Sequence, residues 1–202
     1  MVYVLLAEGF EEVEALAPVD ILRRGGVEVR TVGMTGRTVT GSHGIPVVAD
    51  ILPEEVTAEG MELLVFPGGL PGSDNLNDSP HTDRFLAMAD EAGAHIAAIC
   101  AAPYLLGRRG LLDGVVATSY PAPKFRAQLL GAMVTDERVV TDGRVPTAAG
   151  MGVAEAFGLQ LLAILRGEET AAGIAEAALI DIPEDTLYFE EDTEGDTESA
   201  EE

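Results

Sequence analysis

Short apolar segments alternate with segments of helical periodicity through most of the chain, and this alternation limits the folds that it can adopt. The first apolar run, residues 2–7, carries no charge and is typical of a parallel strand buried on both faces. Residues 11–25 follow with apolar side chains at helical spacing and end in a glycine pair. This order of elements predicts an α/β fold, a sandwich with a mostly parallel central sheet.

The other elements are predicted from the same patterns and from turn residues. Pro18 interrupts the first helix and either kinks it or marks its first full turn. Ser79 and Pro80 have the residue types of a helix N-cap and of the first helical position. Strands are expected at residues 27–32, 62–66, 95–99, 115–118 and 138–141, a short strand near 46–49, and helices at 79–92, 101–107, 151–165 and 168–179.

The balance of charge excludes several classes of partner. The chain carries 35 acidic and 12 basic residues, a net charge of −23. Nucleic acid would be repelled, so no nucleic-acid partner is expected. Lys124 is the single lysine, and such an acidic, lysine-poor composition favours a halophilic protein over an ordinary acidic one, because carboxylates hold water and cations in a salty cytoplasm.

The C-terminal segment differs from the rest in composition. From residue 181 onward there are 11 acidic residues and no basic one. We therefore expect a domain over residues 1–181 and a solvated, disordered acidic tail over 182–202. A tail that binds cations or a partner is the alternative.

Cysteine, histidine and hydropathy narrow the class further. One cysteine cannot form an internal disulfide, and one cysteine with three scattered histidines is a poor match to a zinc cage, so no metal site is expected. The N-terminus lacks the basic segment of a signal peptide, and no apolar stretch reaches the roughly 18 residues of a membrane span. We expect a cytoplasmic protein without a membrane partner.

Cys100 is the strongest candidate for chemistry. It lies between the predicted strand 95–99 and a predicted helix, the strand-to-helix turn of a nucleophile elbow. A side chain at the carboxyl end of a parallel strand points into the crevice where such sheets bind ligands. The helix N-terminus there would favour the thiolate and lower the pKa of the thiol. The alternative is an inert, buried cysteine.

Two further groups of residues could complete a site at this edge. Gly68 and Gly69 follow the strand 62–66 and allow backbone N–H groups to approach an anion, although a plain turn would have the same residues. One carboxyl of the cluster that follows the first strand could lie beside Cys100 and act as a general acid or base, although a solvated face or a helix start would carry the same charges. The candidates are Glu8, Glu11, Glu12 and Glu14. No histidine is placed by its spacing as a base for Cys100.

Four separated blocks resemble the ThiJ/PfpI superfamily. They are residues 5–14, residues 18–26, Val65-Phe66-Pro67-Gly68-Gly69, and residues 97–103 around Cys100. They match in order over about residues 1–180, and the chain is most similar to the branch of the Parkinsonism-associated deglycase/glyoxalase and the bacterial ThiJ-like proteins. This resemblance implies a flavodoxin-like three-layer sandwich and a homodimer.

The resemblance also implies roles for individual residues. Cys100 would be the nucleophile and the oxidation-sensitive thiol, and Glu14 would lie protonated beside the sulfur. The N–H groups of Gly69 and Ala101 would form an oxyanion pocket. The protease-like branch has a histidine where this chain has Ala101, so protease activity is disfavoured.

Three positions depart from the pattern of that branch. Tyr120 stands where many members carry a histidine near the site, and it could help to position the substrate. Residues 150–152 read Gly-Met-Gly instead of Gly-Pro-Gly. A position near His43 holds, in some members, an arginine that approaches the cysteine across the dimer.

Two hypotheses follow. The first is a cofactor-independent glyoxalase or deglycase that acts on small aldehydes or glycated substrates, with Cys100 as nucleophile and Glu14 as acid and base. The second is a non-catalytic oxidative-stress sensor or redox-regulated chaperone that works through oxidation of Cys100. An inert homologue with an unreactive Cys100 is the remaining alternative.

Overall fold

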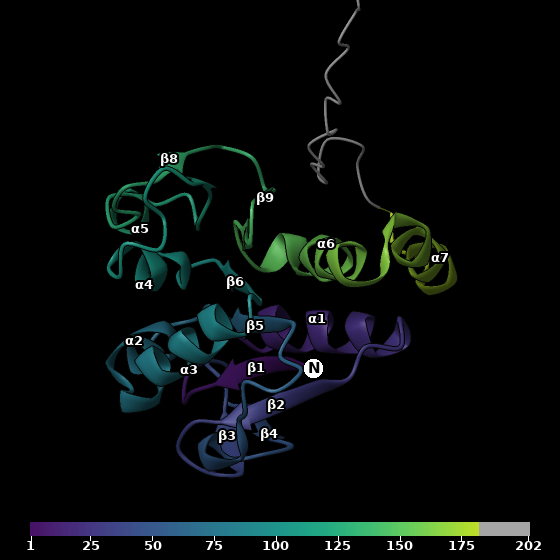
Figure 1. Ribbon diagram of the computed structural model, residues 1–202, viewed down its shortest axis with the longest axis horizontal. Helices are drawn as coiled ribbons and strands as arrows, with labels where there is room; N and C mark the ends of the chain where they lie inside the picture. Colours follow the sequence, from purple (N-terminus) through teal and green to yellow (C-terminus); the bar gives the residue numbers. More distant parts are fainter. Residues whose placement is uncertain (182–202) are drawn as a thin grey trace, which may run out of the picture.

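The computed structural model describes residues 1–181, and its centre is a six-stranded sheet (Figure 1). The strand order is β2-β1-β5-β6-β10-β9, and only β9 runs antiparallel to its neighbour, β10. The strands are β1 (Val2–Leu6), β2 (Val29–Gly33), β5 (Leu63–Phe66), β6 (His95–Ile99), β9 (Val139–Asp142) and β10 (Val145–Ala148). The predicted α/β fold with a mostly parallel sheet is confirmed.

Helices cover both faces of this sheet. On one face α1 (Glu12–Arg24) packs beside α6 (Ala154–Arg166), and α7 (Glu168–Ala178) packs against α6 (Figure 1). The other face is covered by α3 (Pro80–Glu91) and α4 (Pro103–Gly107), with α2 (Gly72–Asp78) next to α3. The shorter elements are β3 (Thr38–Thr40), β4 (Pro46–Val48), η1 (Pro53–Glu55), β7 (Val116–Ala117), α5 (Pro123–Arg126), β8 (Met133–Val134) and η2 (Met151–Val153).

The strict alternation of side chains along β1 explains why there are two cores. Val4 and Leu6 belong to the core that includes Phe157 of α6. Leu5 belongs to the opposite core, with Phe85 of α3. Successive residues of a strand face opposite sides of a sheet, so an uninterrupted apolar run is buried on both. The apolar run that predicted this strand therefore builds both cores.

Helix α1 brings its first turn to the edge of the sheet. The Glu11 side chain caps it by accepting the N–H of Glu14 at 2.7 Å, and Gly25 ends it, so the predicted helix 11–25 is confirmed to within a residue. Pro18 lies inside the helix and lacks the N–H that would bond to the carbonyl of Glu14. The sheet-facing residues, such as Leu22, are buried.

Several elements differ from the prediction. Strand β10 was not predicted, although it lies in the sheet between β6 and β9. Its sequence contains Pro146, and proline usually argues against a strand inside a sheet because it has no N–H to donate to the neighbouring strand. Helix α2 was missed since its sequence has no apolar period, and α5, β3 and β8 were missed since they have only two to four residues. The predicted helix 101–107 begins two residues later, at Pro103.

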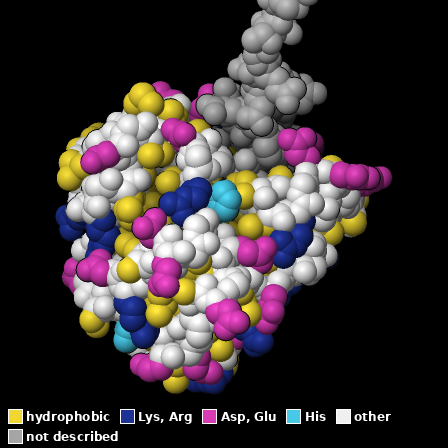
Figure 2. Space-filling view, viewed as in Figure 1, with side chains coloured by type: hydrophobic (Ala, Val, Ile, Leu, Met, Phe, Trp, Pro, Cys, Tyr) yellow, Lys and Arg dark blue, Asp and Glu magenta, His cyan; other side chains and the backbone are white. Residues whose placement is uncertain are grey.

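Other boundaries agree more closely, and some expectations fall outside the described part. The predicted helix 151–165 consists of the 3₁₀ turn η2 followed by α6. Within residues 1–181 no helix is long and apolar enough to cross a membrane. Acidic side chains are spread over the whole face shown in Figure 2. The expected acidic tail, residues 182–202, lies outside the described residues.

Substitution of glycine by alanine should have opposite effects at Gly158, in the contact between α6 and α1, and at Gly173, in α7. A Cβ on Gly158 would lie 2.9 Å from Ile21 Cδ1 and 3.0 Å from Pro18 Cα, whereas a Cβ on Gly173 would meet nothing within 4 Å. Alanine stabilises a helix by roughly 1 kcal/mol over glycine, and overpacking costs about 1–3 kcal/mol. Urea denaturation should therefore show a higher free energy of unfolding for Gly173→Ala and a lower one for Gly158→Ala. Equal gains would contradict the tight packing of α1 on α6.

Candidate active site

Cys100 occupies a sharp turn between β6 and α4. Its φ of +64° is rare for a residue other than glycine and costs about 1–2 kcal/mol. Two backbone hydrogen bonds hold the turn: the Cys100 N–H donates to the Ala148 carbonyl and the Tyr120 N–H donates to the Cys100 carbonyl, both at 2.8 Å. The predicted elbow geometry is thus present, and the unpredicted β10 supplies one of its anchors.

Glu14 is the glutamate that lies beside the cysteine. Its side chain comes from the first turn of α1, is 1% exposed and interacts with the Cys100 thiol. The backbone N–H groups of Gly68 and Met151 also approach this carboxyl. Of the expected glutamate cluster, only Glu14 is turned to the thiol in this way; Glu11 caps the helix and Glu12 bonds to His43.

The two acidic groups hold protons more tightly than isolated side chains do. Burial raises the pKa of Glu14 to about 7, with a smaller contribution from the negative charge of Glu11. Burial and the adjacent Glu14 carboxyl raise the pKa of Cys100 to about 12, against the N–H groups of Gly69 and Ala101, which lower it. The expectation that the helix terminus alone would lower the pKa of this thiol is wrong, because burial and a carboxyl outweigh it.

The pair therefore retains one proton over a wide range of pH. Its first proton leaves near pH 7 and its second near pH 12, and such ionisations belong to the pair, not to either residue. Between these values one proton and one negative charge are shared between an oxygen and a sulfur. The thiol is the weaker acid of the two, so the shared proton lies mainly on sulfur, and the thiolate forms when this proton passes to Glu14.

The glycine turn after β5 fits closely around this pair. A Cβ on Gly68 would collide with Glu14 Oε2 and lie 2.6 Å from Cys100 Cβ. Gly69 has a φ of +89°, a conformation that favours glycine. Its N–H and that of Ala101 both point at the Cys100 sulfur. The structure thus brings together the two N–H groups that the family resemblance implied, one of them in the glycine turn that the sequence alone had indicated.

Tyr120 and the loop after β10 form the outer wall of the site. A Cβ on Gly150 would lie 3.8 Å from Cys100 Sγ and 3.5 Å from the Tyr120 ring, so Gly150 lies close to both the sulfur and this ring. The Tyr120 side chain is 48% exposed and meets the Phe125 ring edge to face at 6.0 Å. The hydrogen bond from the Met151 N–H to the Glu14 carboxyl was not predicted, because the sequence near residue 151 contains no pattern that indicates it.

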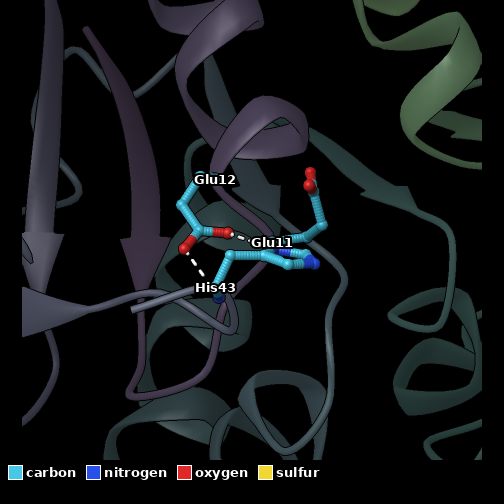
Figure 3. A group of neighbouring side chains, drawn as sticks. All are labelled: Glu11, Glu12 and His43. Carbon is cyan, nitrogen blue, oxygen red and sulfur yellow. Dashed lines mark hydrogen bonds and ion pairs between the residues drawn. The ribbon is translucent and has the colours of Figure 1, made fainter. Parts of the chain in front are cut away.

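The histidines lie away from the thiol. The His43 ring bonds to Glu12 through Nδ1 at 2.9 Å, and the His43 N–H donates to the same carboxyl at 2.8 Å (Figure 3). His81 stacks on Phe85, and His95 begins β6 at the opposite edge of the sheet. The sequence placed no histidine as a base for Cys100, and these positions agree with that.

Glu11, Glu12 and His43 form the group in residues 1–181 whose spacing could hold a metal ion. One ligand atom from each lies within 4.8 Å of the others. The Glu12 oxygens, however, already accept hydrogen bonds from the His43 ring and backbone and from Ser42 and Ile45. This set of donors is that of a structural ion pair, which ties the loop after β3 to the start of α1.

Comparison with known proteins places this geometry in context. The family model described as "DJ-1/PfpI family" matches residues 1–164. Protein dj-1beta of Drosophila melanogaster is 35% identical over 178 residues, which cover 88% of this chain and 95% of that protein. The glutathione-independent glyoxalase DJR-1.2 of Caenorhabditis elegans is 32% identical over 162 residues, 80% of this chain and 86% of that protein.

Other relatives differ in length or are known as structures. The chain spans 46% of protein DJ-1 homolog A of Arabidopsis thaliana, at 36% identity over 181 residues. The oxidized form of Toxoplasma gondii DJ-1 superposes with a TM-score of 0.82 at 36% identity, covering 88% of this chain and 97% of that one. A cysteine mutant of a DJ-1 superfamily protein from Salmonella typhimurium superposes with a TM-score of 0.82 at 35% sequence identity. The match covers 90% of this chain and 98% of that one. These similarities confirm the flavodoxin-like architecture that the resemblance implied.

The shared proton predicts how Cys100 should react with an alkylating reagent. In the unmodified chain, the rate of iodoacetamide modification should rise with an inflection near pH 7, where the pair loses its first proton. Glu14→Gln removes the ionising partner whose carboxylate raises the pKa of Cys100, so this inflection should vanish and the rate should keep rising with pH above 7. Glu155→Gln, the same change on an exposed residue, is the control. An unchanged profile in Glu14→Gln would show that no proton is shared.

Proposed function

The chain belongs to the DJ-1/PfpI family, and from this premise we propose that it is a cofactor-independent, cysteine-dependent enzyme of the glyoxalase or deglycase type. The observation that carries the proposal is the contact of Cys100 with the buried carboxyl of Glu14. A nucleophile, a proton carrier and two N–H donors then meet around one point, the arrangement that addition to a carbonyl requires. The relative named as a glyoxalase supports the same chemistry.

A 2-oxoaldehyde such as methylglyoxal can be converted at this site without an external oxidant. The Cys100 thiolate bonds to the aldehyde carbon, and the oxygen of the hemithioacetal, held by the N–H groups of Gly69 and Ala101, takes the proton from Glu14. The Glu14 carboxylate then removes the hydrogen of that carbon and returns a proton to the neighbouring carbon, while the hydroxyl proton of the hemithioacetal passes to the oxygen of the neighbouring carbon. The first carbon is oxidised as the second is reduced, and a thioester of lactate results.

Water completes the reaction. Hydrolysis of the thioester releases lactate and restores the thiol, with its proton shared again between Cys100 and Glu14. A glycated adduct would enter by the same bond to sulfur. Tyr120, whose ring lies next to Gly150 near the sulfur, would position the substrate where many family members use a histidine.

Turnover of methylglyoxal tests the proposal. The unmodified chain should form lactate without glutathione. Cys100→Ser should fall to background and Glu14→Gln by about 100-fold or more, because general acid–base catalysis contributes about 10²–10⁴. Glu155→Gln should match the unmodified chain. Equal, background-level rates in all of them would rule out glyoxalase chemistry.

A redox role is the second candidate, and the position of Glu14 favours it too. Peroxide would oxidise the Cys100 thiolate to the sulfenic and then the sulfinic acid, with water as the other product. A protonated Glu14 can donate a hydrogen bond to a sulfinate oxygen. A redox sensor or chaperone needs no substrate pocket, only a thiol that stops at this oxidation state.

Intact mass after mild peroxide treatment tests the redox role. The chain should gain two oxygens at Cys100 and stay there. Glu14→Gln, which lacks the acidic proton, should pass more readily to three oxygens. A chain that is not modified, or that goes at once to three oxygens, would count against a sensor.

The homodimer that the resemblance implies stays a prediction, as do the halophilic character and the cytoplasmic location. Val13 and Met151 are exposed apolar side chains that line one hollow with Ile180, which supports a pairing surface there. The molar mass of the full chain in solution decides this point.

A further inference from the structure

Glu11 connects two parts of the site, the glycine turn after β5 and the first turn of α1. Its backbone N–H donates to the Gly68 carbonyl at 2.9 Å, and its Oε2 accepts the N–H of Glu14 at 2.7 Å. One residue therefore ties the glycine turn after β5 to the first turn of α1. A Cβ on Gly69 would collide with the Glu11 nitrogen, which shows how closely the two segments approach.

Capping alone does not require a glutamate at this position. Serine, threonine, aspartate and asparagine are the preferred N-cap residues, and neutral ones cap as well as charged ones. The carboxylate adds a negative charge one helical turn from Glu14, in a half-buried position where solvent screens it less than at a free surface. That charge opposes a second one on the Glu14 carboxyl.

The other charged groups near Glu11 do not cancel its repulsion of a negative charge on Glu14. Glu12 and His43 are the other titratable groups that approach Glu11, and Cys100 is the one that faces Glu14. Glu12 and His43 pair with each other, so their charges largely cancel when His43 is protonated. In Figure 3 the dashed hydrogen bonds join Glu12 to His43 only, and the Glu11 carboxyl takes no part in them. Glu11 thus stays a net negative charge beside the site.

We propose that Glu11 is a positioning residue that biases the shared proton toward Glu14: it holds the backbone of Glu14 against the glycine turn, and its charge opposes a carboxylate at Glu14 and so favours the state with the negative charge on Cys100. The inference deepens the proposed function, because it assigns control of the reactive thiolate to a residue that does not touch the substrate. Because the negative charge of Glu11 repels a second negative charge on Glu14, removing the Glu11 charge should lower the proton affinity of Glu14.

The test is the pH profile of Cys100 alkylation in Glu11→Gln. Glutamine keeps an oxygen that can cap the helix but lacks the charge. The inflection near pH 7 should move about half a unit lower, and the rate above the inflection should fall about two- to threefold, because the proton moves toward sulfur. Glu11→Asp keeps the charge and should restore the inflection of the unmodified chain.

Glu8→Gln is the matched control, since it removes a charge from the same loop at an exposed residue that bonds to the Thr40 N–H. Its profile should not change. A profile of Glu11→Gln that equals the unmodified one, or one that moves equally in Glu8→Gln, would overturn the proposal. Alkylation does not require turnover, so a chain without glyoxalase activity would still give a clear result on Glu11.

Discussion

The proton shared by Glu14 and Cys100 is the interaction on which the arrangement of this site depends. A carboxyl that is 1% exposed can stay beside a thiol only if one of the two remains protonated, because two buried negative charges would repel each other. Four segments enclose the pair: the first turn of α1, the glycine turn after β5, the elbow after β6 and the loop after β10. Each lies at the carboxyl end of a parallel strand, where the topology of the sheet brings them together.

The parts of the fold and site that could be predicted were those with a local signal. The uninterrupted apolar run of β1 and the helical spacing in α1 follow from the burial of side chains, which leaves a period in the sequence. The elbow at Cys100 and the turn at Gly68 were visible because small residues and glycine mark places where a backbone turns sharply. That Glu14 is the glutamate beside the thiol was implied by the family resemblance; the pattern of charges alone left four candidates.

The remaining features depend on contacts between distant segments, and these leave no local pattern. Strand β10 contains Pro146, yet its Ala148 carbonyl holds the N–H of Cys100 at 2.8 Å. The pKa of Cys100 was expected to fall because the helix terminus was visible in the sequence, whereas the depth of burial was not. His43 was placed only by alignment, and its actual partner, Glu12, is 31 residues away in the chain.

Glu12 and Glu14 show how strongly the surroundings decide the state of one residue type. Burial acts to raise the pKa of both, but hydrogen bonds from the His43 ring and backbone outweigh it at Glu12 and bring its pKa to about 2. Glu12 therefore stabilises the fold above its ordinary pKa of 4.5, and this contribution is lost as pH falls toward 2. At Glu14 the shift to about 7 has the opposite sign, so the fold loses stability as pH rises from 4.5 to 7. Glu12 and Glu14 are two residues apart on one helix. The Glu12 carboxylate stabilises the fold, whereas Glu14 lowers the stability of the fold in the pH range where the proton that it holds would take part in chemistry at Cys100.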